Sequence, residues 1–184
     1  LLVGKAEIPT EISLNAKPQL SGARKVVISP LANEYPLKHY NWVQDNIKKV
    51  DQASNGRIGY IYIPDMGPEG LNEFARYFYP QLDKEGLIID DRANGGGNVS
   101  PMILERFSRE PYRLTMGRGT SHVGTVPDAV QVGPKVCLIN KYSASDGDLF
   151  PWGFRALGLG KLIGTRTWGG IVGISGSLPY MDGT

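Results

Sequence analysis

Cysteine and histidine are scarce in this chain of 184 residues, which has one cysteine and two histidines. The single cysteine, Cys137, cannot form an internal disulfide or contribute to a zinc site made of several cysteines. Because it lies in an apolar run, we interpret it as a small buried hydrophobic residue. The histidines do not have metal-ligand spacing with a carboxylate. We therefore expect no metal site.

Strong net charge and long apolar runs are also absent. The formal net charge is +2, which is too small to indicate nucleic acid or an acidic membrane surface as a partner. No run approaches the ~18 apolar residues of a membrane-spanning helix, and the first residues lack the pattern of a signal peptide. We expect neither nucleic acid nor a membrane among the partners. Glycine is abundant, with 24 residues, which favours a loop-rich enzyme core over a helical bundle.

Strands and helices are predicted to alternate along most of the chain. Short apolar runs bounded by turn-forming residues predict strands at 11–14, 25–29, 57–64, 86–90 and 135–140. Apolar residues at every third or fourth position predict helices at 37–50, 70–82, 99–107 and 149–157. The alternation from residue 57 onward predicts βαβ units, and therefore an α/β fold with a largely parallel sheet.

The stretch Asn140-Lys-Tyr-Ser-Ala-Ser-Asp-Gly-Asp148 separates a predicted strand from a predicted helix. A buried strand fixes such a turn and a helix N-terminus offers free N–H groups, so a serine there is well placed to act as a nucleophile. Ser143 and Ser145 both compete for this role. The alternative is that Ser or Asp caps the helix, which is their usual role at such a position.

A second turn, Asn94-Gly-Gly-Gly-Asn98, follows the predicted strand 86–90. In an open parallel sheet the C-terminal ends of the strands meet at one edge, where active sites gather. Consecutive glycines let the backbone approach a ligand and direct N–H groups at it, which suits an oxyanion hole or a phosphate. No nucleotide-binding glycine motif is present. A flexible or left-handed turn is the structural alternative.

A nucleophilic serine needs a base within hydrogen-bond reach. His39 falls in the predicted helix 37–50, where we expect it at the surface. His122 lies in the glycine-rich stretch Gly117-Arg-Gly-Thr-Ser-His-Val-Gly124 and is a local candidate for the base.

Four motifs together resemble the tricorn-like serine peptidases, which are relatives of the C-terminal (tail-specific) processing peptidases. In order, they are Gly56-Arg-Ile-Gly-Tyr-Ile-Tyr-Ile-Pro-Asp-Met66, Asp90-Asp-Arg-Ala-Asn-Gly-Gly-Gly97, Asn140-Lys-Tyr-Ser-Ala-Ser-Asp-Gly-Asp148 and Leu162-Ile-Gly-Thr-Arg-Thr-Trp-Gly-Gly170. The resemblance covers residues 57–184. It implies a spiral βαβ core of the Clp protease/crotonase type there, truncated at its C-terminus. It further implies a linker helix in residues 32–56 and the C-terminal strands of a PDZ-like β domain in residues 1–31.

The resemblance also implies site residues. The nucleophile would be Ser145 rather than Ser143, and the backbone N–H groups of Asp146 and of Gly96 or Gly97 would form the oxyanion hole. Tail-specific peptidases have a Lys base where this chain has Gly170, so the tricorn-like arrangement with a His base is preferred. In that family the His precedes the PDZ domain and an orienting Glu lies beyond the match, so neither position falls in this chain.

The resemblance therefore implies a serine endopeptidase core that is inactive, or nearly so, without its flanks. Peptides or unfolded protein segments are the expected substrates, no cofactor is expected, and the complete enzyme is expected to be a homo-oligomer. The lone cysteine fits a cytoplasmic location. Two other classes of function stay open. One is a non-catalytic peptide-binding module, and the other is a crotonase-type acyl-CoA enzyme, which needs an oxyanion hole but no nucleophilic serine.

Overall fold

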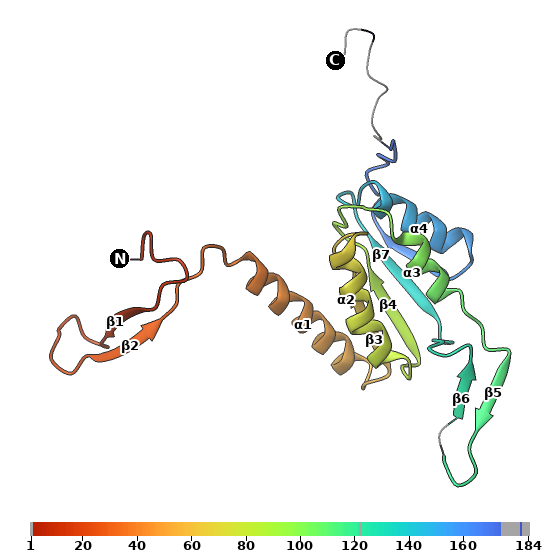
Figure 1. Ribbon diagram of the computed structural model, residues 1–184, viewed down its shortest axis with the longest axis horizontal. Helices are drawn as coiled ribbons and strands as arrows, with labels where there is room; N and C mark the ends of the chain where they lie inside the picture. The colour runs from red at the N-terminus through yellow and green to blue at the C-terminus, as the bar shows by residue number, and fades with distance from the viewer. Residues whose placement is uncertain (1, 122, 174–180, 182–184) are drawn as a thin grey trace. The chain divides into compact units, whose positions relative to one another are not determined.

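The computed structural model describes residues 2–121, 123–173 and 181, and the chain divides into two compact units, Leu1–Gln44 and Asp45–Thr184 (Figure 1). The boundary falls within helix α1 (Tyr35–Ala53). In the described part of the chain, no helix is long and apolar enough to cross a membrane.

The first unit contains an antiparallel strand pair, β1 (Thr10–Leu14) and β2 (Arg24–Ile28). The turn between them is closed by Asn15, whose side-chain amide donates to the carbonyls of Gln19 and Ser21 at 2.7 and 2.9 Å. Both strands were predicted from the sequence. Their membership of a PDZ-like domain stays a prediction.

The second unit is built on a parallel sheet with the strand order β3-β4-β7-β8. The strands are β3 (Ile58–Tyr62), β4 (Gly86–Asp90), β7 (Lys135–Ile139) and β8 (Gly160–Gly164). The crossover helices are α2 (Pro68–Phe78), α3 (Ser100–Phe107) and α4 (Asp146–Ala156), and Figure 1 shows them together in front of the sheet. The prediction of an α/β fold with a parallel sheet is confirmed.

The hydrophobic core lies between this sheet and its three helices. Each helix contributes aromatic or aliphatic side chains, and each of β3, β4 and β7 contributes alternate residues. The buried members include Ile61, Leu87, Ile89, Cys137, Phe78, Phe107, Phe150 and Phe154. This packing fixes the C-terminal ends of β4 and β7, which lie side by side because Asp90 pairs with Leu138.

Several elements differ from the predictions. Helix α4 begins at Asp146, three residues earlier than expected, and α2 gives way to a short 3₁₀ turn, η1 (Tyr79–Gln81). Strand β8 and the hairpin of β5 (Arg113–Met116) and β6 (Val123–Val126) were not predicted. Strand β5 is exposed, and β6 and β8 are only partly buried, so none of them carries the continuous apolar run by which buried strands are recognised.

Candidate active site

Ser145 immediately precedes α4, and its backbone has φ 57° and ψ −120°. A non-glycine residue in this region costs on the order of 1–3 kcal/mol, which surrounding contacts must offset. The Ser145 N–H donates to the Gly170 carbonyl at 3.1 Å, and the Ser145 carbonyl accepts from the Asp148 N–H at 2.9 Å. The residue is exposed, and its side chain makes no capping hydrogen bond. Ser145 thus occupies the N-cap position of α4, but its side chain does not cap the helix.

Ser143 has a different environment from Ser145. It is buried, and its Oγ donates a hydrogen bond to the Asp91 carbonyl at 2.7 Å. Its own carbonyl accepts from the Trp168 N–H at 3.0 Å. Because its hydroxyl is buried and already bonded to the backbone, Ser143 stabilises the turn, and Ser145 is the better candidate for a nucleophile.

The glycine run packs directly against the Ser145 turn. A Cβ on Gly96 would lie 2.6 Å from the Ser145 Cβ and 3.1 Å from the Asp146 nitrogen, and Gly96 has φ 88°. The Gly96 N–H donates to the Asn94 side-chain oxygen at 2.9 Å. For the N–H groups of Gly97 and Asp146, no acceptor is present among the described residues. Of the two glycines expected in the oxyanion hole, Gly97 is thus the one with an available donor, while Gly96 provides room for Ser145.

Three hydrogen bonds join the glycine run to the nucleophile turn and the core. The Ala144 N–H donates to the Asn94 carbonyl at 3.0 Å, and the Ala93 N–H donates to the Asn140 side-chain oxygen at 3.0 Å. The Asn94 amide donates to the Ile63 carbonyl at 3.0 Å. The two turns singled out in the sequence are therefore held as one unit at the C-terminal edge of the sheet.

A third segment, residues 165–171, also contacts the nucleophile turn. Asp148, in the first turn of α4, accepts a hydrogen bond from the Gly169 N–H at 2.7 Å. The next residue, Gly170, is the one that accepts from Ser145. Sequence reasoning missed Asp148 and Gly169, because an Asp at the start of a helix predicts only a favourable interaction with the helix dipole.

A network of hydrogen bonds around Asp90 holds the C-terminal end of β4, just before the glycine run. The buried Asp90 carboxylate accepts hydrogen bonds from the Tyr60 hydroxyl at 2.6 Å and from the Arg92 guanidinium at 2.8 and 2.5 Å. Burial, followed by the adjacent Asp90 charge, raises the pKa of Tyr60, and the hydrogen bond to Asp90 raises the pKa of Arg92. Tyr60 therefore stays neutral and Arg92 stays charged, which suits a structural role before the glycine run.

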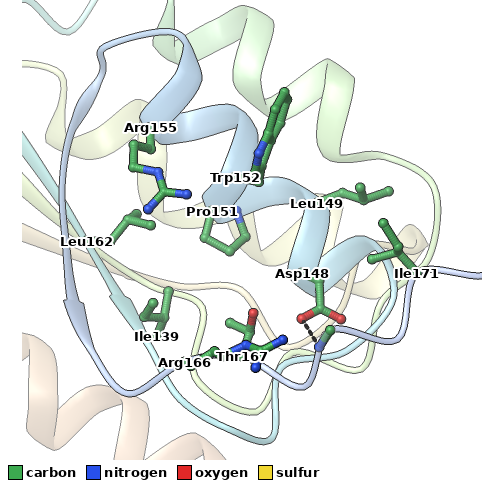
Figure 2. A pocket seen from close by; sticks show the side chains of 11 residues that line it. Ile139, Asp148, Leu149, Pro151, Trp152, Arg155, Leu162, Arg166, Thr167 and Ile171 are labelled. Carbon is green, nitrogen blue, oxygen red and sulfur yellow. Dashed lines mark hydrogen bonds between the residues drawn. The ribbon is translucent and has the colours of Figure 1, made fainter.

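A pocket of about 590 Å³ lies beside α4 and the segment 165–171 (Figure 2). Its wall is largely apolar and includes Ile139, Leu149, Pro151, Leu162 and Ile171. Asp148 borders it, and Figure 2 shows its hydrogen bond to the Gly169 nitrogen. The Leu149 N–H also donates to the Ser145 carbonyl at 3.2 Å, so the pocket wall is continuous with the nucleophile turn.

The described part of the second unit contains no histidine. His39 lies in α1 of the first unit, with its ring 5.6 Å from the Tyr35 ring and 5.9 Å from the Trp42 ring. His122, the local candidate for the base, lies outside the described residues. Among the residues that are described, no group of His, Cys, Asp and Glu could hold a metal ion.

The sequence that forms this site is similar to sequences of known proteins. The model of Peptidase family S41 matches residues 57–184. This chain belongs to that family. Across its whole length it is 42% identical to tricorn protease from Thermoplasma volcanium and 38% identical to tricorn protease homolog 1 from Streptomyces coelicolor. It covers 18% and 17% of those proteins.

The fold is similar to that of a solved relative. The crystal structure of the tricorn protease aligns with 97% of this chain at a TM-score of 0.85 and 41% identity, and the match covers 17% of that protein. The chain thus spans less than a fifth of the relatives it matches. The resemblance expected from the four motifs is confirmed, and with it the α/β peptidase-type fold of the second unit.

Proposed function

We propose that this chain carries the nucleophile and the oxyanion hole of a serine endopeptidase. The observation that carries the proposal is the exposed Ser145, held at positive φ beside two backbone N–H groups that lack acceptors in the described structure. The Ser145 Oγ attacks the carbonyl carbon of a peptide bond and gives its proton to a base. The base then protonates the leaving amine, and water hydrolyses the acyl-enzyme.

The oxyanion hole consists of the N–H groups of Gly97 and Asp146. Developing negative charge on the carbonyl oxygen needs fixed donors at about 3 Å, and each such donor contributes about 10²–10³ in rate. The Asp146 N–H belongs to the first turn of α4, where the helix dipole adds to its effect. Gly96 contributes the space that lets the two turns approach each other.

We further propose that the base and its orienting residue come from segments outside this chain. Gly170 occupies the position where tail-specific peptidases have their Lys, and glycine has no side chain to act as a base. In this arrangement the 184-residue chain alone is inactive or nearly so, because an unactivated serine hydroxyl loses orders of magnitude in rate.

Labelling with a fluorophosphonate serine probe tests this function. Three proteins are compared: the 184-residue chain, its Ser145→Ala variant, and a longer protein in which the chain is joined to the flanking segments of a tricorn relative. We expect only the longer protein to label, and Ser145→Ala in it to abolish labelling. Equal labelling of the short chain at Ser145 would contradict the external base and would favour a local one such as His122.

A non-catalytic peptide-binding module is the second candidate. Gly170 favours it, because glycine stands where tail-specific peptidases have their Lys base, and a core without a base can still bind a peptide. It predicts that no serine labels in the 184-residue chain or in the longer protein, while a peptide still binds to both. A crotonase-type enzyme predicts instead that acyl-CoA turnover survives Ser145→Ala, because that chemistry uses the oxyanion hole alone.

The complete enzyme is proposed to act on peptides or unfolded protein segments, in the cytoplasm and as a homo-oligomer. The pocket beside α4 has room for a substrate side chain.

The hairpin β5–β6 supports self-association, because Leu114 and Met116 are 65% and 70% exposed. Light scattering of the longer protein tests the oligomer, and a monomer would contradict it.

A further inference from the structure

The carboxyl group of Asp91 is completely buried beneath the nucleophile turn. Its N–H donates to the Leu138 carbonyl at 2.9 Å and so continues the pairing of β4 with β7 by one residue. Side chains alternate along a strand, so Asp91 follows Leu87 and Ile89 onto the face of the sheet that the helices cover. It is 0% exposed, and neither carboxylate oxygen has a hydrogen-bond partner among the described residues.

The Asp91 backbone joins the two catalytic turns. Its carbonyl accepts from the Ser143 Oγ at 2.7 Å and from the Asn94 N–H at 3.2 Å. Ser143 lies two residues before the nucleophile, and Asn94 begins the glycine run. A displacement of Asp91 would therefore move both halves of the oxyanion hole.

The titratable groups that act on the Asp91 side chain are all acids. Asp90 lies on the same strand, while Asp146 and Asp148 act on it from the first turn of α4, and Cys137 faces it from β7. The Arg92 guanidinium is hydrogen-bonded to the neighbouring Asp90. A charged Asp91 would thus be a further buried negative charge below the donors that must hold an oxyanion.

We propose that Asp91 is a positioning residue that works in its neutral, protonated form, and that its ionisation displaces the Ser145 turn and slows acylation. Burial, and after it the three neighbouring aspartates, raise the pKa of Asp91 well above its ordinary value, while the nearby Ser143 side chain lowers it. The Ser143 hydroxyl donates its hydrogen bond to the Asp91 backbone carbonyl, so both carboxylate oxygens lack a partner and burial prevails. A neutral carboxyl costs far less to bury than an ionised one. The effect on acylation rests on the proposed function, whereas the protonation of Asp91 in the folded chain does not.

The first test measures stability, which does not depend on catalysis. A carboxyl whose pKa is raised in the folded state binds its proton more tightly there, so its contribution to stability is present at low pH and lost as pH rises. The 184-residue chain and its Asp91→Asn variant are unfolded with urea between pH 4 and pH 9. Asparagine has a similar shape and stays neutral. Asp83→Asn, at an exposed aspartate, is the control.

We expect the ratio of the unfolding constants of wild type and Asp91→Asn to rise by about tenfold per pH unit above the ordinary aspartate pKa of about 4, up to the folded-state value. Asp83→Asn should show no such rise. Parallel curves for wild type and Asp91→Asn would overturn the proposal, because Asp91 would then be ionised in the folded protein throughout. Asp91→Leu adds a second neutral variant, in case the amide group fails to pack.

The second test measures the nucleophile turn itself. In the longer protein, we expect fluorophosphonate labelling of Ser145 to fall several-fold at alkaline pH relative to Asp91→Asn, and parallel rates would overturn the positioning role. If no serine labels, the proposed function fails, and the amide NMR signals of Ala144 and Ser145 then decide. If the chemical shifts of these amides change with pH in wild type but not in Asp91→Asn, the inference is supported. If they do not change with pH in wild type, the inference is overturned.

Discussion

The Asp148 carboxylate and the Gly169 N–H are joined by a hydrogen bond of 2.7 Å, one residue from the carbonyl that accepts from Ser145. The contact therefore holds the segment that fixes the nucleophile backbone. We predict that Asp148→Ala lowers the labelling rate of the longer protein at least tenfold and destabilises the chain by about 1–3 kcal/mol, because the Gly169 N–H loses its partner. Asp148→Asn keeps an acceptor oxygen and should lose less.

These two variants distinguish a hydrogen bond from a requirement for charge. Labelling rates with the fluorophosphonate probe and urea unfolding curves are measured for both. Equal losses for Asp148→Asn and Asp148→Ala would contradict the acceptor role. They would show that the negative charge in the first turn of α4 is what matters.

Gly96 and Gly95 provide a matched pair in the glycine run. A Cβ on Gly96 would lie 2.6 Å from the Ser145 Cβ and 2.7 Å from the Ala144 carbonyl, and its φ of 88° strains any side chain. A Cβ on Gly95 would meet nothing within 4 Å. We predict that Gly96→Ala reduces the rate of Ser145 labelling more than 100-fold, because loss of an oxyanion-hole donor lowers rates by about 10²–10³ and the added methyl group displaces this turn. Gly95→Ala should change the labelling rate less than threefold. Similar rates for the two variants would contradict the close packing.

The sequence was informative where local pattern and fold act together. The apolar runs before the glycine turn and before the Ser145 turn predicted strands of one largely parallel sheet, and this placed the two turns at the C-terminal edge of the sheet. That the two strands are direct neighbours came only from the structure. Periodicity could not show that Asp91 is buried and unpaired while its neighbour Asp90 is bonded to Arg92. That difference depends on which face of β4 the helices cover. The Asp148–Gly169 contact likewise joins segments that only the folded chain brings together.

Gln81 covers part of the outer edge of β3, which is the first strand of the sheet. Its side-chain oxygen accepts from the Tyr60 N–H at 2.9 Å, and its amide donates to the Tyr60 carbonyl at 3.0 Å. The side chain thus replaces one residue of a neighbouring strand. We predict that Gln81→Leu destabilises the chain by about 1–3 kcal/mol and promotes aggregation, since the strand edge is left unpaired. Urea unfolding and light scattering measure the two effects.

The exposed Gln52, in α1, is the control for this substitution. Gln52→Leu adds the same apolar side chain to a surface position without freeing a strand edge. If Gln52→Leu aggregates as readily as Gln81→Leu, added surface hydrophobicity explains the result, and the edge-covering role of Gln81 is contradicted.

Cys137 lies in the core on β7 and offers a chemical measure of how often the sheet opens. Burial raises the pKa of its thiol, and the nearby Asp91 and Asp90 raise it further. Because the thiolate is the reactive form, we predict that iodoacetamide does not modify the native chain at neutral pH over hours, and that it modifies the chain within minutes in concentrated urea. The chain has no other cysteine, so mass spectrometry reads this one site directly. Rapid modification of the native chain would mean that β7 separates from α4 without global unfolding, and the rigid support assigned to the Ser145 turn would then be wrong.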